Sequence, residues 1–256
     1  MIKRFNRYEL KYFIHVSQQS NLIRDLETMV TPDPHGDDSA SYRIINLYYD
    51  SPDMQGFWSK MDGLKFRRKL RLRIYPRESL QSVKEGMVEI KQRINETVQK
   101  RRIQLPLEDA EALCGGWLDL DRVPEDDLAT ANEIAYMVHA LDVQPTAITS
   151  YRREAYVGGM YDAGLRITFD TDFRGRVNAL QVNEDTVNRL MMSPDWCILE
   201  VKVNETLPQW VISLLAKHQC RRQRVSKYCA VVASANNIKS RQRNMPAPVP
   251  LFTPEK

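Results

Sequence analysis

Six cations stand among the eleven residues 65–75, KFRRKLRLRIY, and no acidic residue separates them. Successive side chains of a β-strand point to opposite faces, so the odd-numbered cations from Lys65 to Arg73 share one face. Apolar side chains fill the other face, with Arg68 as the exception. At an effective dielectric constant near 20, cations about 7 Å apart repel each other by roughly 2 kcal/mol. An enclosed face of this kind needs a multivalent anion, and guanidinium groups bind phosphate through paired hydrogen bonds.

The same alternation of ionic and apolar positions recurs in four other segments. Their ionic positions are Arg7, Glu9 and Lys11; Glu89, Lys91 and Arg93; Arg166, Thr168 and Asp170; and Glu200 and Lys202. For any one strand, the simpler interpretation is the solvated face of an antiparallel sheet. The recurrence of lysine and arginine on strand after strand favours a closed barrel, whose ionic face lines a channel and whose apolar face lies under helices.

Hydrophobic periodicity predicts seven or eight strands and several helices, which gives an α+β fold. Strands are predicted at residues 7–14, 42–50, 65–75, 86–94, 147–157, 164–170, 174–180 and 196–203, with 100–106 as a further strand or a continuation. Helices are predicted at residues 17–30, 54–61, 105–116, 124–142, 207–219 and 226–237. The first helix is expected to start at Ser17 or Ser20, because serine side chains cap helix N-termini well.

The 256 residues include 37 basic and 33 acidic side chains, a net charge of +4. These charges are segregated along the chain. Residues 65–102 hold thirteen basic and four acidic residues, whereas residues 108–127 hold eight acids and one arginine. A concentration of cations in one region favours an anionic partner.

Several classes of protein are disfavoured. The N-terminus is too polar for a secretory signal, and no run of about 18 apolar residues could span a membrane. The four isolated cysteines indicate a reducing, cytoplasmic location, and the four scattered histidines argue against zinc. No GxxxxGK[ST] loop is present, so side chains must bind any phosphate. Residues 1–238 are expected to form one domain, followed by a proline-rich, mobile tail at 239–256.

Eight short motifs occur in an order that resembles the VTC domain, the polyphosphate polymerase domain of the vacuolar transporter chaperone family. They are RYELKY, NLYYDS, KLRLRIY, EIKQR, SYRREAY, LRITFD, ILEVK and VSKY, and the resemblance covers roughly residues 4 to 235. The wider group is that of the triphosphate tunnel metalloenzymes. The resemblance implies an antiparallel eight-stranded β-barrel, a tunnel lined by basic residues, with helices packed on its outside.

Through this resemblance, the chain is expected to transfer the terminal phosphate of metal-bound ATP to a growing polyphosphate chain. The residues that match phosphate-contacting positions of the family are Lys11, Arg71, Arg73, Lys91, Arg153, Arg166 and Lys227. Further substrate-binding positions are expected at Lys69, Arg93, Tyr151, Ser226 and Arg224. Glu200 matches the carboxylate that binds Mn²⁺ or Mg²⁺, and Glu89 is the second candidate.

The resemblance has two departures. Arg7 stands where the wider group often has the first glutamate of an ExExK motif, which leaves Glu9 and Lys11. The eukaryotic polymerase subunit also carries a regulatory SPX domain and works with membrane-embedded partners. These 256 residues are not expected to contain either feature, so the resemblance implies nothing about regulation by inositol pyrophosphates or coupling to translocation. Association with a separate membrane protein stays open, as does the acceptor, which is polyphosphate, inorganic phosphate or pyrophosphate.

Two other functions remain open. The same tunnel could transfer phosphate to water, as a metal-dependent hydrolase of triphosphates or polyphosphate. A non-catalytic protein that binds RNA or another polyanion would add exposed aromatic rings for base stacking, and Tyr48, Tyr49 and Tyr75 are the candidates. Enclosed cations without such rings would favour polyphosphate, so no nucleic-acid partner is expected.

Overall fold

A computed structural model describes residues 8–36, 41–95 and 97–238. Its strands are β1 (Tyr8–His15), β2 (Val30–Pro32), β3 (Ser41–Asp50), β4 (Phe66–Ile74), β5 (Glu85–Ile94), β6 (Thr97–Pro106), β7 (Gln144–Gly158), β8 (Arg166–Arg176), β9 (Arg189–Leu190), β10 (Trp196–Val203) and β11 (Arg221–Arg222). Its α-helices are α1 (Val16–Leu26), α2 (Gln55–Met61), α3 (Leu107–Gly115), α4 (Leu128–Leu141), α5 (Gln209–Lys217) and α6 (Lys227–Ala235). Arg7 and the tail at 239–256 lie outside the described residues.

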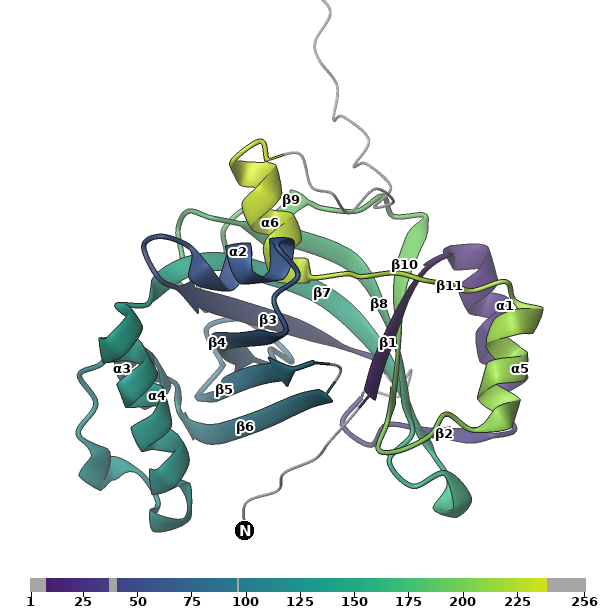
Figure 1. Ribbon diagram of the computed structural model, residues 1–256, viewed down its shortest axis with the longest axis horizontal. Helices are drawn as coiled ribbons and strands as arrows, with labels where there is room; N and C mark the ends of the chain where they lie inside the picture. The colour runs from purple at the N-terminus through teal and green to yellow at the C-terminus, as the bar shows by residue number, and fades with distance from the viewer. Residues whose placement is uncertain (1–7, 37–40, 96, 239–256) are drawn as a thin grey trace, which may run out of the picture.

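One curved antiparallel sheet contains all the strands, and its hydrogen-bonded order is β11-β1-β10-β8-β7-β3-β4-β5-β6 (Figure 1). The short strands β2 and β9 pair with β7 and β8 beside this path. The predicted α+β fold with an antiparallel sheet is confirmed. The sheet has more strands than the eight expected, and within the described residues no backbone pairing joins β6 to β1 or β11. The barrel is therefore open along one seam.

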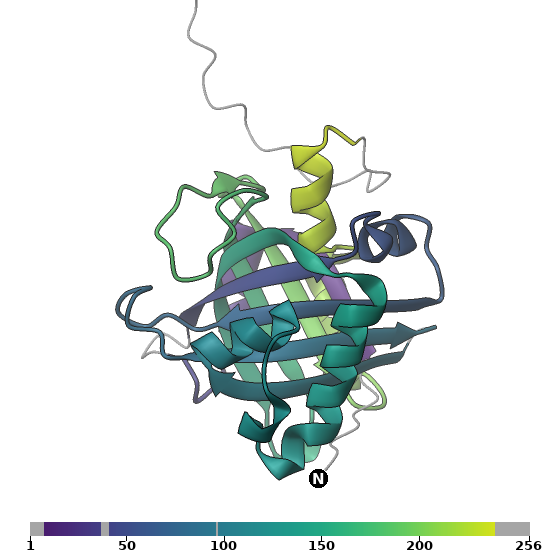
Figure 2. The ribbon, with the colours of Figure 1, turned by 90° about the vertical axis from the view of Figure 1, so that its left-hand side faces the viewer.

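The apolar faces of the strands point outward, and helices cover them. Helices α3 and α4 pack over β4, β5 and β6, in a core that includes Leu70, Leu72 and Ile103 (Figure 2). Helices α1 and α5 cover β1, β8 and β10 around Phe169 and Leu199. Two of the three hydrophobic cores thus lie outside the sheet. The third, which includes Ile44, Tyr48 and Ile198, packs against α2 and α6 at one end of the inner face. Ionic side chains occupy the rest of that face, as the alternation predicted.

Helices α2 and α6 close one end of the curved sheet, and the buried Asp50 ties them together. Its carboxylate accepts hydrogen bonds from the backbone N–H groups of Gly56 at 2.7 Å and Phe57 at 2.9 Å, at the start of α2. The Tyr228 hydroxyl of α6 donates to the same carboxylate. A Cβ atom at position 56 would lie 2.9 Å from Asp50 Oδ1, so this close approach requires glycine.

Two local predictions were wrong. The N-cap of α1 is His15, whose Nδ1 accepts a hydrogen bond from the Ser17 backbone N–H at 3.2 Å, rather than a serine. The strand expected at 174–180 ends at Arg176. The Arg176 guanidinium donates to the carbonyl oxygens of Ala179 at 2.8 Å and Gln181 at 2.9 Å, which folds the chain into a loop. None of the described helices is long and apolar enough to cross a membrane.

Candidate functional site

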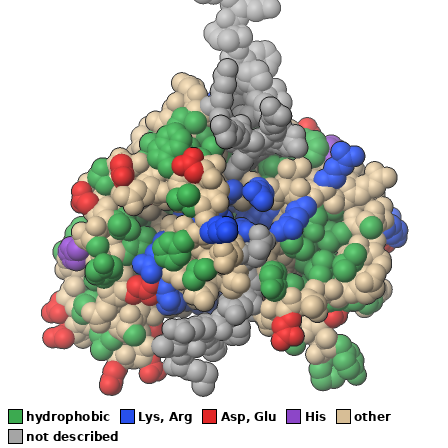
Figure 3. All heavy atoms as spheres, in the orientation of Figure 1, with side chains coloured by type: hydrophobic (Ala, Val, Ile, Leu, Met, Phe, Trp, Pro, Cys, Tyr) green, Lys and Arg blue, Asp and Glu red, His purple; other side chains and the backbone are tan. Residues whose placement is uncertain are grey.

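The inner face of the sheet encloses a cavity of about 3350 Å³, which we call the tunnel. Side chains from β1, β3, β4, β5, β6, β7, β8 and β10 and from the start of α6 line it. In the space-filling view, lysine and arginine side chains gather at the centre of the face, between two largely apolar regions (Figure 3). Two opposed walls can be distinguished by their charge.

The first wall, which we call the cationic wall, consists of β4, β5 and β6 and is organised around Glu89. This carboxylate is completely buried, accepts a hydrogen bond from Arg71 Nε at 2.6 Å and contacts the Lys100 ammonium. Arg73 Nε lies 3.8 Å from it. Burial alone would raise the pKa of Glu89, but Arg71, Arg73 and Lys100 hold that pKa well below its ordinary value. Glu89 is therefore ionised and fixes three cations.

Hydrogen bonds to neighbouring strands fix the two central arginines. The Arg73 guanidinium donates from Nε to Asn46 Oδ1 at 2.8 Å, and Asn46 in turn donates to Thr149 Oγ1 at 3.0 Å. Arg71 donates to the Tyr48 hydroxyl at 3.1 Å. Because these partners are buried in β3 and β7, the guanidinium groups are held in place before any anion binds.

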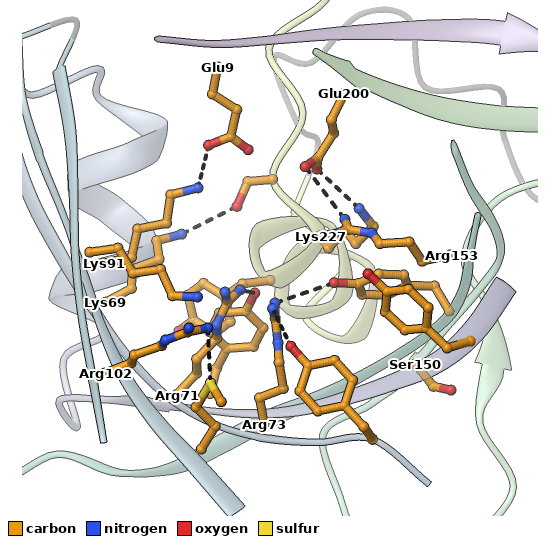
Figure 4. Close-up of a pocket in the computed structure, with 18 of the residues that line it drawn as sticks. Glu9, Lys69, Arg71, Arg73, Lys91, Arg102, Ser150, Arg153, Glu200 and Lys227 are labelled. Carbon is orange, nitrogen blue, oxygen red and sulfur yellow. Dashed lines mark hydrogen bonds and ion pairs between the residues drawn. The ribbon is translucent and has the colours of Figure 1, made fainter. Parts of the chain in front are cut away.

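The second wall, which we call the carboxylate wall, consists of β1, β7, β8, β10 and the start of α6. In the β1–β10 register, Lys11 faces Glu200 and Glu9 faces Lys202, so the charges alternate. Lys11 Nζ lies 2.8 Å from Glu200 Oε1 and 3.1 Å from Glu9 Oε1, and therefore bridges two carboxylates. Glu9 Oε2 also accepts from Lys91 Nζ of the cationic wall at 2.6 Å (Figure 4).

Glu200 is surrounded by cations. Besides Lys11, its carboxylate lies 3.0 Å from Lys202 Nζ, and 3.5 Å from both Arg153 and Lys227 (Figure 4). Burial favours the neutral acid, yet these cations keep the pKa of Glu200 well below its ordinary range. Burial also lowers the pKa of Lys202, to about 8, against the opposing pull of Glu200.

A fully buried aspartate, Asp170, holds two of the cations of this wall. Arg153 donates two hydrogen bonds to Asp170, at 2.6 and 2.7 Å, and Lys227 Nζ lies 2.5 Å from the same carboxylate. Ser226, the residue before Lys227, caps α6 by accepting from the Cys229 backbone N–H. The cap and the ion pair together aim the first residue of α6 into the tunnel.

Tyr151 lies where the two walls meet. Its hydroxyl is 3.5 Å from an Arg73 nitrogen of the cationic wall. Its ring lies 4.4 Å from Lys227 Nζ and 5.3 Å from the Arg153 guanidinium carbon of the carboxylate wall. A phosphate at this position would touch cations from both sides of the tunnel.

The structure brings the predicted site residues together. Those that line the tunnel are Lys11, Lys69, Arg71, Arg73, Lys91, Arg93, Tyr151, Arg153, Arg166, Glu200, Arg224, Ser226 and Lys227. Glu89 is the exception, because it is buried beneath the arginines that it holds. Arg166 is tied to Asp33 at 2.5 Å and to the Tyr42 hydroxyl at 2.7 Å. Lys69 Nζ lies 3.3 Å from both Ser226 Oγ and Cys229 Sγ.

The sequence interpretation did not assign two residues that line the tunnel, Lys100 and Arg102 of β6. It placed Lys202 and Asp170 on ionic faces but gave them no role in the site. Lys202 lines the tunnel, and the buried Asp170 positions Arg153 and Lys227. A period-two reading of residues 98–104 would have found Lys100 and Arg102, since Val98 and Gln104 line the tunnel as well.

A divalent cation fits the carboxylate wall only together with phosphate. Among the described residues, no three His, Cys, Asp or Glu side chains are grouped so as to hold a metal. Glu9 and Glu200 nevertheless lie close together, because both form ion pairs with Lys11. The buried Thr168 faces Glu200 in the β8–β10 register, and its hydroxyl has no hydrogen-bond partner among the described atoms. Mg²⁺ and Mn²⁺ take oxygen ligands, and Mg²⁺ is commonly held by one or two carboxylates together with substrate phosphates.

Solved structures with a similar fold come from several organisms. A candidate adenylate cyclase from Bacillus halodurans is 12% identical, with a TM-score of 0.52 over 88% of this chain and 96% of that one. A protein from Pyrococcus horikoshii is 14% identical, with a TM-score of 0.46 over 90% and 99% of the two chains. A Hippeastrum protein, described as a candidate adenylyl cyclase with a dominant triphosphatase activity, is 11% identical, with a TM-score of 0.46 over 90% and 96%.

Sequence comparison is more specific. No curated protein matches the chain. A family model, described as the VTC domain, matches residues 6–236, which include every residue of the two walls. The chain therefore belongs to the VTC domain family.

Proposed function

We propose that the protein is a polyphosphate polymerase, which transfers the terminal phosphate of ATP to a polyphosphate chain inside the tunnel. Membership of the VTC domain family supports an enzyme that acts on triphosphates. The observation that carries the proposal is the set of cations from both walls that meet around Tyr151, fixed in place by buried partners. Phosphoryl transfer asks a protein mainly for positioning and for neutralisation of charge, which this arrangement supplies.

The reaction exchanges one phosphorus–oxygen bond for another. A terminal oxygen of the polyphosphate chain forms a bond to the γ-phosphorus of ATP. The bond between that phosphorus and the oxygen bridging to the β-phosphate breaks, and ADP leaves with the electron pair. The attacking phosphate oxygen is already ionised, so the step needs no general base.

Different side chains bind the phosphates and the divalent cation. Arg71 and Arg73 bind phosphate oxygens from one side, and Arg153 and Lys227 bind them from the other, so that charge developing in the transition state stays neutralised. Glu200, with Glu9 beside it, would hold a divalent cation on the ATP phosphates, which supplies further neutralisation of the leaving group. The lysines that neutralise these carboxylates, Lys11 and Lys202, have flexible stems and can turn to phosphate.

The three tyrosines that were candidates for base stacking give no support to an RNA-binding function. Tyr48 is 8% exposed and Tyr49 is 7% exposed, so neither ring is free to stack on a base. Tyr75 is 39% exposed, but it lies against Tyr42, with ring centroids 5.9 Å apart. The cations are enclosed, and these three rings are not available for bases to stack on. This favours a polyphosphate ligand over nucleic acid.

The test is incubation of the protein with ATP and Mn²⁺ or Mg²⁺, followed by gel separation of the products. Chains of increasing length support the polymerase. Release of free phosphate alone would identify a hydrolase that uses water as the acceptor, and would overturn the proposal. Arg153→Met serves as the control for contaminating kinases, because it removes a fixed cation from the meeting point of the walls.

A further inference from the structure

The two walls of the tunnel differ in how far their positive charge is compensated. Among the described residues of β4, β5 and β6, eight cations and two carboxylates occupy tunnel-facing positions: Arg67, Lys69, Arg71, Arg73, Lys91, Arg93, Lys100 and Arg102, with Glu85 and Glu89. Around Glu200 and Asp170, the carboxylate wall presents five cations and three carboxylates: Lys11, Arg153, Arg166, Lys202 and Lys227, with Glu9, Asp170 and Glu200. Farther along β7 and β8, the tunnel is also lined by Arg152, Asp172 and Arg174. The excess of positive charge therefore lies on the cationic wall.

Individual contacts show the same difference. On the carboxylate wall every one of the five cations is paired with a carboxylate: Lys11 and Lys202 with Glu200, Arg153 and Lys227 with Asp170, and Arg166 with Asp33. On the cationic wall, Lys69 lies against Ser226 and Cys229, and the Arg102 guanidinium lies 3.7 Å from the sulfur of Met87. Neither Lys69 nor Arg102 contacts a carboxylate among the described residues.

The two phosphate substrates of a polymerase differ in how much negative charge they carry. A polyphosphate chain without bound metal carries roughly one negative charge for each phosphate and is best held by cations that no carboxylate neutralises. A nucleoside triphosphate with a divalent cation has lost part of its charge and needs a protein oxygen for the metal. The cationic wall suits the first ligand, and the carboxylate wall suits the second.

We propose, on the basis of the polymerase function above, that the tunnel has two unlike phosphate subsites. The cationic wall binds the metal-free polyphosphate chain, which is the acceptor, and the carboxylate wall binds the metal-bound ATP, which is the donor. The subsites meet at Tyr151, which contacts Arg73 of one wall and Arg153 and Lys227 of the other. Specificity for the acceptor is thereby separated from specificity for the donor.

The experiment measures the affinity of each ligand by calorimetry for two matched variants. Arg102→Gln removes a cation from the cationic wall, and Lys202→Gln removes one from the carboxylate wall. The probes are tripolyphosphate in EDTA and a non-hydrolysable ATP analogue with Mn²⁺. Arg68→Gln is the control, because Arg68 lies on the outer face of β4 and donates to Gln92.

We expect Arg102→Gln to weaken tripolyphosphate binding at least tenfold and to change binding of the Mn²⁺–nucleotide less than twofold. Lys202→Gln should show the opposite pattern, and Arg68→Gln should change neither affinity. Equal losses for both ligands in both variants would overturn the division into subsites while leaving the polymerase function standing. If the unmodified protein bound neither probe, the polymerase function itself would fail, and the subsites with it.

Discussion

Replacement of Glu89 by glutamine tests whether this buried carboxylate holds the cationic wall together. The change keeps the shape of the side chain and removes the one carboxylate that, among the described residues, forms ion pairs with Arg71, Arg73 and Lys100. Removing one partner of a buried ion pair costs about 3–5 kcal/mol, because the other charge stays buried without compensation. At about 2–4 °C for each kcal/mol in a chain of this size, the melting temperature should fall by roughly 6–20 °C.

A polyanion should restore what the substitution removes. Tripolyphosphate in EDTA would place negative charge beside the same three cations, so its stabilising effect should be larger in Glu89→Gln than in the parent. At a concentration of about 100 Kd, binding adds about 2.7 kcal/mol to the free energy of unfolding. Thermal unfolding followed by circular dichroism, with and without tripolyphosphate, measures both effects. Glu85→Gln is the matched control, since Glu85 lies on the same strand, accepts a hydrogen bond from Gln104 and forms no ion pair among the described residues.

A melting temperature of Glu89→Gln within about 2 °C of the parent would refute this reasoning. So would a rise with tripolyphosphate no larger than that of the parent protein. If Glu89→Gln instead lost Mn²⁺ binding with its stability unchanged, Glu89 would be a metal ligand, as the sequence had suggested, rather than the counter-charge of the arginines.

Three further predictions concern metal, charge and pH. Glu200→Gln should abolish metal-dependent turnover while circular dichroism shows an intact fold; near-normal turnover would remove Glu200 from the site. Because lysines already neutralise Glu200, Mn²⁺ should bind the protein weakly by itself and at least tenfold more tightly with tripolyphosphate. The electron paramagnetic resonance signal of free Mn²⁺ measures both affinities. Tight binding of Mn²⁺ without phosphate would contradict this prediction. Burial lowers the pKa of Lys100 to about 7, and a bound phosphate would raise this pKa. The affinity for tripolyphosphate should therefore decline from pH 7 to pH 9 more in the parent protein than in Lys100→Arg. Identical pH profiles would exclude Lys100 as the titrating contact.

The direction in which each strand faces could be predicted from the sequence. Apolar and ionic residues alternate in β4 apart from Arg68, and the structure places Leu70 and Leu72 under helices and Arg71 and Arg73 in the tunnel. When one face of a strand is buried, the sequence determines which face points into the tunnel, because a shift by one residue would expose every apolar side chain. The same alternation therefore turned nearly all of the expected site residues inward.

The partner of each charged residue could not be predicted, because partners depend on the register between strands. Lys91 lies two residues from Glu89 on the same face of the same strand, so local spacing alone would favour it as the ion-pair partner. The structure pairs Glu89 with Arg71, its direct neighbour on β4, and with Lys100 on β6. Lys91 reaches across to Glu9 instead. No local pattern contains this information, since residues 9 and 91 are brought together only by the curvature of the whole sheet.

The open seam between β6 and β1 has a mechanical consequence. A Glu9–Lys91 ion pair crosses from the β1 side to β5, where a closed barrel would have a ladder of backbone hydrogen bonds. Parting a ladder exposes a row of backbone amide groups, whereas parting this seam separates side chains, and the Lys91 side chain is already 34% exposed. The circumference of the sheet can therefore change without breaking a row of backbone hydrogen bonds. Under the proposed polymerase function, a polyphosphate chain longer than the tunnel would then not need to be threaded from its end.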